Sequence, residues 1–183
     1  MDFLLVFKFL IKTLKSQNID FALIGGFALQ AAGIARTTRD IDLIILSKDA
    51  QRIKEIMLRH GYRVIHESED VLNFAGKKFE LGKVDFLLAH RKYAIAMLSR
   101  AEERWVLQGK FKIKVLRVED LIGLKVQASA NDPKRLHQDI ADIELLIRNN
   151  YSKLDIGLLQ EYFQLFGREK ELRQILKEIP NVE

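Results

Sequence analysis

Cysteine is absent from the 183 residues of the chain. Disulfide bonds and thiolate zinc sites are therefore excluded, and we expect a cytoplasmic protein. Low-complexity tracts and internal repeats are also missing. No apolar run reaches the ~18 uninterrupted residues of a membrane span, so we expect no membrane contact. What remains, with 48% hydrophobic and 30% charged residues, is the composition of an ordinary globular protein.

The N-terminus is apolar but lacks the features of a signal peptide. An acid stands at position 2, Lys8 and Lys12 interrupt the apolar run, and no small-residue cleavage site follows. Apolar residues recur at helical spacing in this stretch, which predicts an amphipathic helix over residues 2–16 that packs on the domain.

The net charge of +5 comes from 30 basic and 25 acidic residues. This mild excess of positive charge suits a polyanionic partner such as a nucleotide or RNA.

The pattern of the chain predicts an α/β (α+β) fold in two parts. Residues 1–117 are expected to form a mixed β-sheet core flanked by helices, and residues 118–183 a helical region packed on that core. Strands are predicted at 21–24, 40–46, 62–67, 71–76, 77–82 and 83–89, with a hairpin turning near Gly109. Helices are predicted at 27–33, at 48–61 with Ser47 as N-cap, at 92–103, and throughout the C-terminal part, where Pro133 occupies a first turn.

Two aspartates open the strongest predicted strand, "DIDLIIL". Because alternate side chains of a strand point to the same face, Asp40 and Asp42 project side by side. Carboxylates this close repel one another, and a hard divalent ion such as Mg²⁺ or Mn²⁺ relieves the repulsion. Asp85, inside the apolar strand "KVDFLL", offers a third carboxylate. Three such groups can hold two metal ions for phosphoryl displacement, and Asp85 can also accept the proton of an attacking hydroxyl.

A glycine pair lies between the strand ending at Ile24 and the next helix. Gly25 and Gly26 allow close approach, and the helix start that follows is an anion site suited to a triphosphate. Arg36 and Arg39 can reach phosphate oxygens, while Thr37 and Thr38 add hydroxyl groups.

These motifs resemble a known superfamily. The string "GGFALQAAGIARTTRDIDL", followed by a lone Asp on a later strand, resembles the nucleotidyltransferases that include DNA polymerase β. It is most similar to AbiEii-type toxins and to small antibiotic nucleotidyltransferases. The segment "LIGLKVQASANDPKRLHQDIADIELLI" resembles the helical region of AbiEii-like proteins, and the resemblance covers roughly residues 20–148.

The resemblance implies roles for individual residues. Gly25 and Gly26 would hold the triphosphate, although many relatives carry Gly-Ser at this place. The metal ligands would be Asp40, Asp42 and Asp85, and nucleotide contacts are implied for Lys125 and Asp139.

The leading hypothesis is therefore a magnesium-dependent transferase that moves a nucleoside monophosphate from an NTP such as ATP to a hydroxyl group. The acceptor could be RNA such as tRNA, a protein or a small molecule, and the resemblance suggests a toxin with an antitoxin protein as partner. One alternative is a non-catalytic nucleotide- or RNA-binding module of the same fold. Another is a nucleotide-sugar glycosyltransferase, whose Asp-x-Asp motif grips manganese, although such domains are longer and lack the glycine pair.

Each acidic motif also has a purely structural interpretation. Asp40 and Asp42 could be salt-bridged by Arg36 and Arg39, the glycine pair could be a plain turn, and Asp85 could be a charge on an edge strand.

The C-terminal half leaves similar alternatives. Lys125 could snorkel from an amphipathic helix, and Asp139 and Asp142 could form a solvated face or pair with Arg135. We expect Trp105 in the core, the alternative being a platform on which a base stacks. The lysines of "KFKIK" (Lys110, Lys112 and Lys114) could form a solvated edge or a surface for an acidic acceptor, and the four histidines show no metal-ligand spacing.

Overall fold

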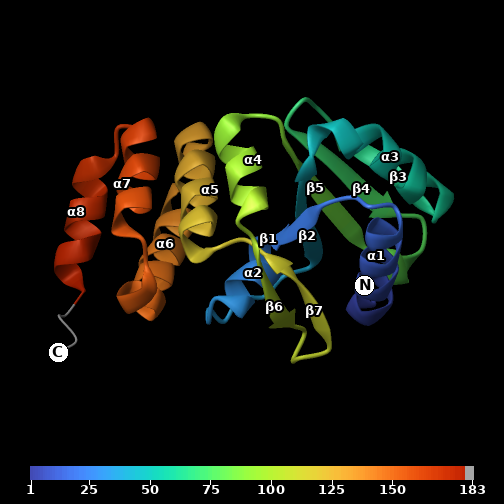
Figure 1. Cartoon of the computed structure of the whole chain (residues 1–183), viewed down its shortest axis with the longest axis horizontal. Helices are drawn as coiled ribbons and strands as arrows, with labels where there is room; N and C mark the ends of the chain where they lie inside the picture. The colour runs from blue at the N-terminus through green and yellow to red at the C-terminus, as the bar shows by residue number, and fades with distance from the viewer. Residues whose placement is uncertain (180–183) are drawn as a thin grey trace. The chain divides into compact units, whose positions relative to one another are not determined.

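The computed structural model describes residues 1–179, which form two compact units (Figure 1). The first unit contains residues 1–31 and 35–117 and is a mixed β-sheet with helices. The second contains residues 32–34 and the chain from Val118 onward, and it is helical. The predicted α/β class with a helical C-terminal part is thus confirmed.

Seven strands form one sheet in the order β3-β4-β5-β2-β1-β7-β6. Their bounds are β1 Phe21–Ile24, β2 Asp40–Leu46, β3 Tyr62–Glu67, β4 Val71–Gly76, β5 Lys83–Ala89, β6 Glu102–Val106 and β7 Phe111–Val115. The pairs β2–β5 and β1–β7 are parallel, and the other neighbours are antiparallel. The strand that carries Asp85 therefore lies in the middle of the sheet, beside the strand that carries Asp40 and Asp42.

The helices of the first unit are α1 Phe3–Ser16, α2 Gly25–Ala31, α3 Ala50–Arg59 and α4 Lys92–Ser99. Asp2 caps α1, because its Oδ1 accepts a hydrogen bond of 3.0 Å from the N–H of Leu5. Phe7 of α1 stacks on Phe111 of β7 and meets Phe27 of α2 edge to face. The amphipathic helix predicted at the N-terminus therefore covers the apolar side of the sheet.

The central strands have one fully apolar face. Its residues are buried and alternate along β2, β4 and β5: Ile41, Leu43 and Ile45; Leu72 and Phe74; Val84, Phe86 and Leu88. The opposite face carries the half-buried polar residues Asp40, Asp42, Asn73 and Asp85, together with apolar residues such as the buried Ile44. The period of two in each strand thus separates the core from the polar residues described below.

Three local predictions were wrong. Residues 77–82 form a loop with a 3₁₀ turn at Phe79–Leu81, because a 2.7 Å bond from the Gly76 N–H to the Gly82 carbonyl closes the chain before it can extend. Ser47 is not an N-cap, because Ser47–Asp49 is itself a 3₁₀ turn whose backbone accepts from Ala50. The helix predicted at 92–103 ends at Ser99, since the chain from Glu102 pairs with β7.

Trp105 does not lie in the core, as had been expected, but is 62% exposed. The next residue, Val106, is buried, so β6 turns this valine and not the indole toward the interior. The predicted hairpin around Gly109 is confirmed, with Lys112 and Lys114 on one face and Lys110 in the turn before the strand.

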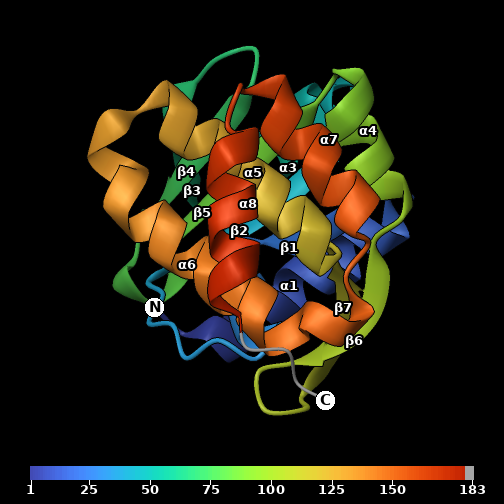
Figure 2. The ribbon, with the colours of Figure 1, turned by 90° about the vertical axis from the view of Figure 1, so that its left-hand side faces the viewer.

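The second unit contains the helices α5 Val118–Asn131, α6 Leu136–Asn150, α7 Ile156–Leu165 and α8 Glu169–Glu178. Figure 2 shows α8 in front of α5, with α6 and α7 to either side. Close packing of α5 on α7 depends on Gly123, since a Cβ there would lie 2.8 Å from the ring of Tyr162. None of the helices within residues 1–179 has the length and apolarity that a membrane span requires.

Candidate active site

The strand register brings the acidic residues to one face of the sheet. Asp42 is paired directly with Asp85 across the parallel strands β2 and β5, and Asp40 is paired with Lys83. Paired residues of neighbouring strands point to the same side, and so do alternate residues of one strand. Asp40, Asp42 and Asp85 therefore project from the same side of two adjacent central strands.

Asp85 carries an unusual buried oxygen. Its Oδ1 is buried without a hydrogen-bond partner, and so is Oδ1 of Asn73, its direct neighbour on β4. Burial raises the pKa of Asp85, and the charge of Asp40 raises it further, while a hydrogen bond from Asn73 and the ammonium of Lys83 lower it. The interpretation of Asp85 as an edge-strand charge is wrong, because β5 has neighbours on both sides.

Unpartnered oxygens of this kind suit a hard cation. Oxygen ligands are what Mg²⁺ and Mn²⁺ prefer, and a buried acceptor without a donor costs free energy until something satisfies it. Within residues 1–179, no group of three or more His, Asp or Glu side chains is arranged so that it could hold a metal ion as the structure stands. The donor set fits a divalent ion in its chemistry, and metal binding by these aspartates stays a prediction.

The glycine pair is packed against the acidic strand. Gly25 has φ +62°, and a Cβ there would overlap Oδ2 of Asp42 and lie 2.7 Å from its Cβ. A Cβ on Gly26 would lie 2.5 Å from the Cβ of Thr38. Only glycine permits both the turn and this close approach to Asp42. Gly25 therefore has a steric role in addition to forming the turn.

The loop before β2 supplies the other residues predicted to bind the nucleotide. Thr38 is half-buried, and its Oγ1 donates a 2.9 Å hydrogen bond to the carbonyl of Asp40, which fixes the start of the strand. The carbonyl of Arg36 accepts a 2.6 Å bond from the side chain of Gln30, and Arg39 is exposed. Arg36 and Arg39 thus lie within four residues of Asp40 in sequence, and their contact with phosphate stays a prediction.

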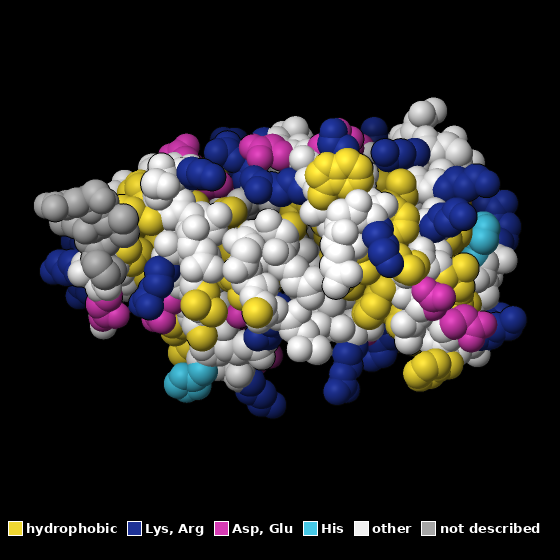
Figure 3. All heavy atoms as spheres, turned by 90° about the horizontal axis from the view of Figure 1, so that it is seen from below, with side chains coloured by type: hydrophobic (Ala, Val, Ile, Leu, Met, Phe, Trp, Pro, Cys, Tyr) yellow, Lys and Arg dark blue, Asp and Glu magenta, His cyan; other side chains and the backbone are white. Residues whose placement is uncertain are grey.

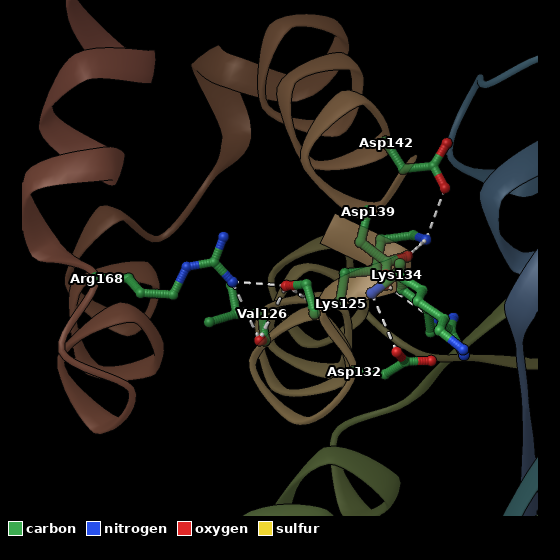
Figure 4. A network of polar contacts seen from close by, with 9 residues as sticks. Lys125, Val126, Asp132, Lys134, Asp139, Asp142 and Arg168 are labelled. Atoms are coloured by element: carbon green, nitrogen blue, oxygen red, sulfur yellow. Dashed lines mark hydrogen bonds and ion pairs between the residues drawn. The ribbon is translucent and has the colours of Figure 1, made fainter. Parts of the chain in front are cut away.

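Lys125 belongs to the second unit, where it joins two buried aspartates (Figure 4). Its Nζ donates to Oδ1 of Asp139 at 2.9 Å and to Oδ2 of Asp142 at 2.7 Å, and Arg135 donates to Asp139 at 3.2 Å. Asp139 is fully buried and Asp142 is 3% exposed, so the idea of a solvated face is wrong, whereas the pairing of Asp139 with Arg135 is confirmed. The nucleotide contact predicted for Lys125 is not tested by these bonds.

Sequence reasoning missed Asn73. A signal was present, because Asn73 interrupts the apolar strand "VLNFAG" just as Asp85 interrupts the next strand. Its importance rests on its position directly opposite Asp85, which only the antiparallel register of β4 and β5 reveals.

Comparison with known families gives one match. A family model described as "Nucleotidyl transferase AbiEii toxin, Type IV TA system" matches residues 9–181. No curated protein matches the sequence.

Several solved structures are similar. The solution structure of the antibiotic-resistance factor ANT(2'')-Ia is 15% identical, with a TM-score of 0.63 over 95% of this chain and 97% of its own. An antigenic nucleotidyltransferase-like protein from Paracoccidioides brasiliensis is 18% identical, with a TM-score of 0.55 over 92% of this chain and 88% of its own. The lincosamide antibiotic adenylyltransferase LnuA is 15% identical, with a TM-score of 0.52 over 76% of this chain and 93% of its own. At these identities the likeness shows a shared fold.

Proposed function

Since the chain belongs to the AbiEii family of nucleotidyltransferase toxins, we propose that it transfers a nucleoside monophosphate from an NTP to a hydroxyl group in a magnesium-dependent reaction. The observation that carries this proposal is the direct pairing of Asp42 with Asp85, with Asp40 on the same face and Gly25 packed against Asp42. An ordinary strand pair would place apolar side chains at these central positions.

The aspartates would hold the metal and the reacting groups. When bound, magnesium stabilises the attacking and leaving oxygens of an in-line displacement. The acceptor oxygen forms a bond to the α-phosphorus, the bond to the leaving pyrophosphate breaks, and Asp85 accepts the proton of the hydroxyl. The half-buried position of Asp85, directly beside Asp42 on the central strands, supports this role.

The remaining predicted residues would contact the nucleotide. The backbone of Gly25 and Gly26 would approach the phosphates closely, and Arg36, Thr38 and Arg39 would add donors from the loop before β2. For Lys125, a nucleotide contact is proposed on the family resemblance alone. We infer ATP as the donor, since ANT(2'')-Ia has also been solved in complex with adenylyl-2''-tobramycin and LnuA is described as an adenylyltransferase.

We further propose that the protein acts as the toxin of a toxin–antitoxin pair in the cytoplasm. The family description supports this role and implies an antitoxin protein as partner. Among possible acceptors, RNA such as tRNA suits the net charge of +5 better than a protein or a small molecule does.

The test is a transfer assay with α-labelled NTPs, magnesium and candidate acceptors. Asp42→Asn and Asp85→Asn should abolish transfer, whereas Asp49→Asn, a buried aspartate beyond the far end of the same strand, should retain it. Transfer that survives both site substitutions would overturn the proposal. NTP binding by calorimetry without turnover on any acceptor would instead support a non-catalytic nucleotide-binding module.

A further inference from the structure

The only tryptophan of the chain is displayed on an edge strand. Trp105 of β6 is 62% exposed and is paired directly with Lys112 of β7. The side chains of Lys112 and Lys114 are 52% and 40% exposed, and Lys110 is exposed in the adjoining turn. An exposed aromatic face beside positive charge combines the two features by which proteins bind single-stranded nucleic acid.

This surface lies on the same side of the sheet as the carboxylates. Leu23 of β1 is paired with Leu43 and with Val115, so these three residues share the apolar face. The residue before each partner, Asp42 in β2 and Lys114 in β7, therefore points to the opposite face.

Trp105 belongs to that same polar face, since its partner Lys112 is two positions from Lys114. Across the sheet, β6 and β2 are three strand spacings apart. Along the strand direction, Trp105 is offset from Asp42 by four residues. With ordinary strand dimensions the separation is roughly 20 Å.

The charge of the hairpin favours an anionic ligand. Lys112 pairs with Glu103 at 3.1 Å and Lys114 with Asp20 at 2.7 Å, while Lys15 adds positive potential near Glu103. Exposed ion pairs contribute little to stability, so phosphates can replace these two carboxylates at small cost. Seen from below, Lys and Arg side chains are spread over the molecular surface, with Asp and Glu side chains and groups of hydrophobic ones among them (Figure 3).

We propose that this hairpin face, made of Trp105, Lys110, Lys112 and Lys114, binds single-stranded nucleic acid. A base stacks on the indole while the lysines contact the flanking phosphates, a combination that binds single strands with little sequence preference. Roughly 20 Å corresponds to about six stacked nucleotides at 3.4 Å each, so a bound strand can extend from Trp105 to the aspartates. If the proposed function holds, the end of this bound strand is the acceptor.

Binding can be measured without catalysis, because the single tryptophan is its own reporter. A 12-nucleotide single-stranded RNA, titrated without NTP, should quench the emission of Trp105. By anisotropy of the labelled RNA, Trp105→Ala should weaken binding about tenfold. Lys112→Glu should weaken binding and lower the slope of affinity against salt by about one. Phe79→Ala and Lys48→Glu are the matched controls, as Phe79 is 90% exposed and Lys48 is an exposed lysine beyond β2.

Unchanged emission on saturation with RNA would overturn the proposal, and so would equal affinities of Trp105→Ala and Phe79→Ala. Melting curves for every variant identify any that fail to fold, and Trp105→Phe then replaces Trp105→Ala. Asp42→Asn separates the two proposals because it should still bind RNA. If RNA binds as described but no transfer occurs, the proposed function is wrong and RNA binding by the hairpin face is supported. If transfer occurs only on small acceptors and RNA does not bind, RNA binding by the hairpin face is wrong and the proposed function is supported.

Discussion

Replacement of Gly25 by alanine tests the arrangement of the site most directly. Gly25 has φ +62°, a conformation that costs alanine about 1–2 kcal/mol relative to glycine. The new Cβ would also overlap the carboxylate of Asp42 and lie 2.7 Å from its Cβ, a contact that side-chain rotation cannot relieve, so the backbone must shift at a cost of about 1–3 kcal/mol more. We expect Gly25→Ala to lose about 2–5 kcal/mol of unfolding free energy in urea titrations.

The effect on transfer should be larger than the effect on stability. Displacing a reacting group by 1 Å can cost about 10²-fold in rate, so we expect transfer by folded Gly25→Ala to fall at least that far. Gly167→Ala is the matched control, because Gly167 has φ +65° and no atom within 4 Å of an added Cβ. It should lose only about 1–2 kcal/mol and keep its activity. Equal transfer rates for the two variants would refute the idea that Gly25 makes room for a functional Asp42.

Three further predictions concern charge. In metal-free buffer, Asp85→Asn should be more stable than the wild type at neutral pH, because burial raises the pKa of Asp85 and penalises its ionised form. The folded protein then binds the proton more tightly than the unfolded chain, so wild-type stability falls as pH rises from about 4 through the raised pKa, and urea titrations should show the two proteins converging in acid. Magnesium should raise the melting temperature of the wild type but not of Asp85→Asn, and an equal rise would exclude Asp85 as a ligand. Lys125→Met should lose about 3 kcal/mol, because Asp139 and Asp142 lose their shared ammonium, and adding Asp142→Asn should restore part of the loss.

The sequence predicted the first five strands with their observed bounds. Runs limited by glycine or by polar and charged residues indicated β1 to β5, whether the run is strongly apolar as in β2 or mixed as in β3. The run at 77–82 was mistaken for a strand because local pattern contains no information on the Gly76–Gly82 backbone bond. The local sequence thus indicates where a strand can form, while hydrogen bonds to other parts of the chain decide whether it forms.

The fate of Trp105 shows another limit of sequence pattern. Trp105 and Val106 are consecutive apolar residues, so alternation alone cannot say which of them faces the interior. Val106 is paired with Phe111, whose ring stacks on Phe7 of α1, and this contact turns the tryptophan outward. The choice of face was decided by a helix about 100 residues earlier in the chain, beyond the reach of any local window.

The aspartates combine both kinds of information. Their positions in apolar strands were visible in the sequence, but the pairing of Asp42 with Asp85 depends on a parallel register between strands separated by a helix and two other strands. Asn73 interrupts an apolar strand in the same way, but only the antiparallel register of β4 and β5 places it opposite Asp85.

Asp85 and Gly25 contribute to stability in opposite ways at this site. A buried, unpartnered oxygen on Asp85 costs free energy that an apolar residue would avoid, whereas glycine at position 25 adopts its left-handed backbone without strain. We therefore expect substitutions at the two positions to change stability in opposite directions. Substitution of Asp85 by Asn should raise stability while abolishing transfer, whereas substitution of Gly25 by Ala should lower both. If stability and transfer fell together at Asp85, its carboxylate would be a structural element of the sheet, and the argument for a metal-binding site at this face would lose its physical basis.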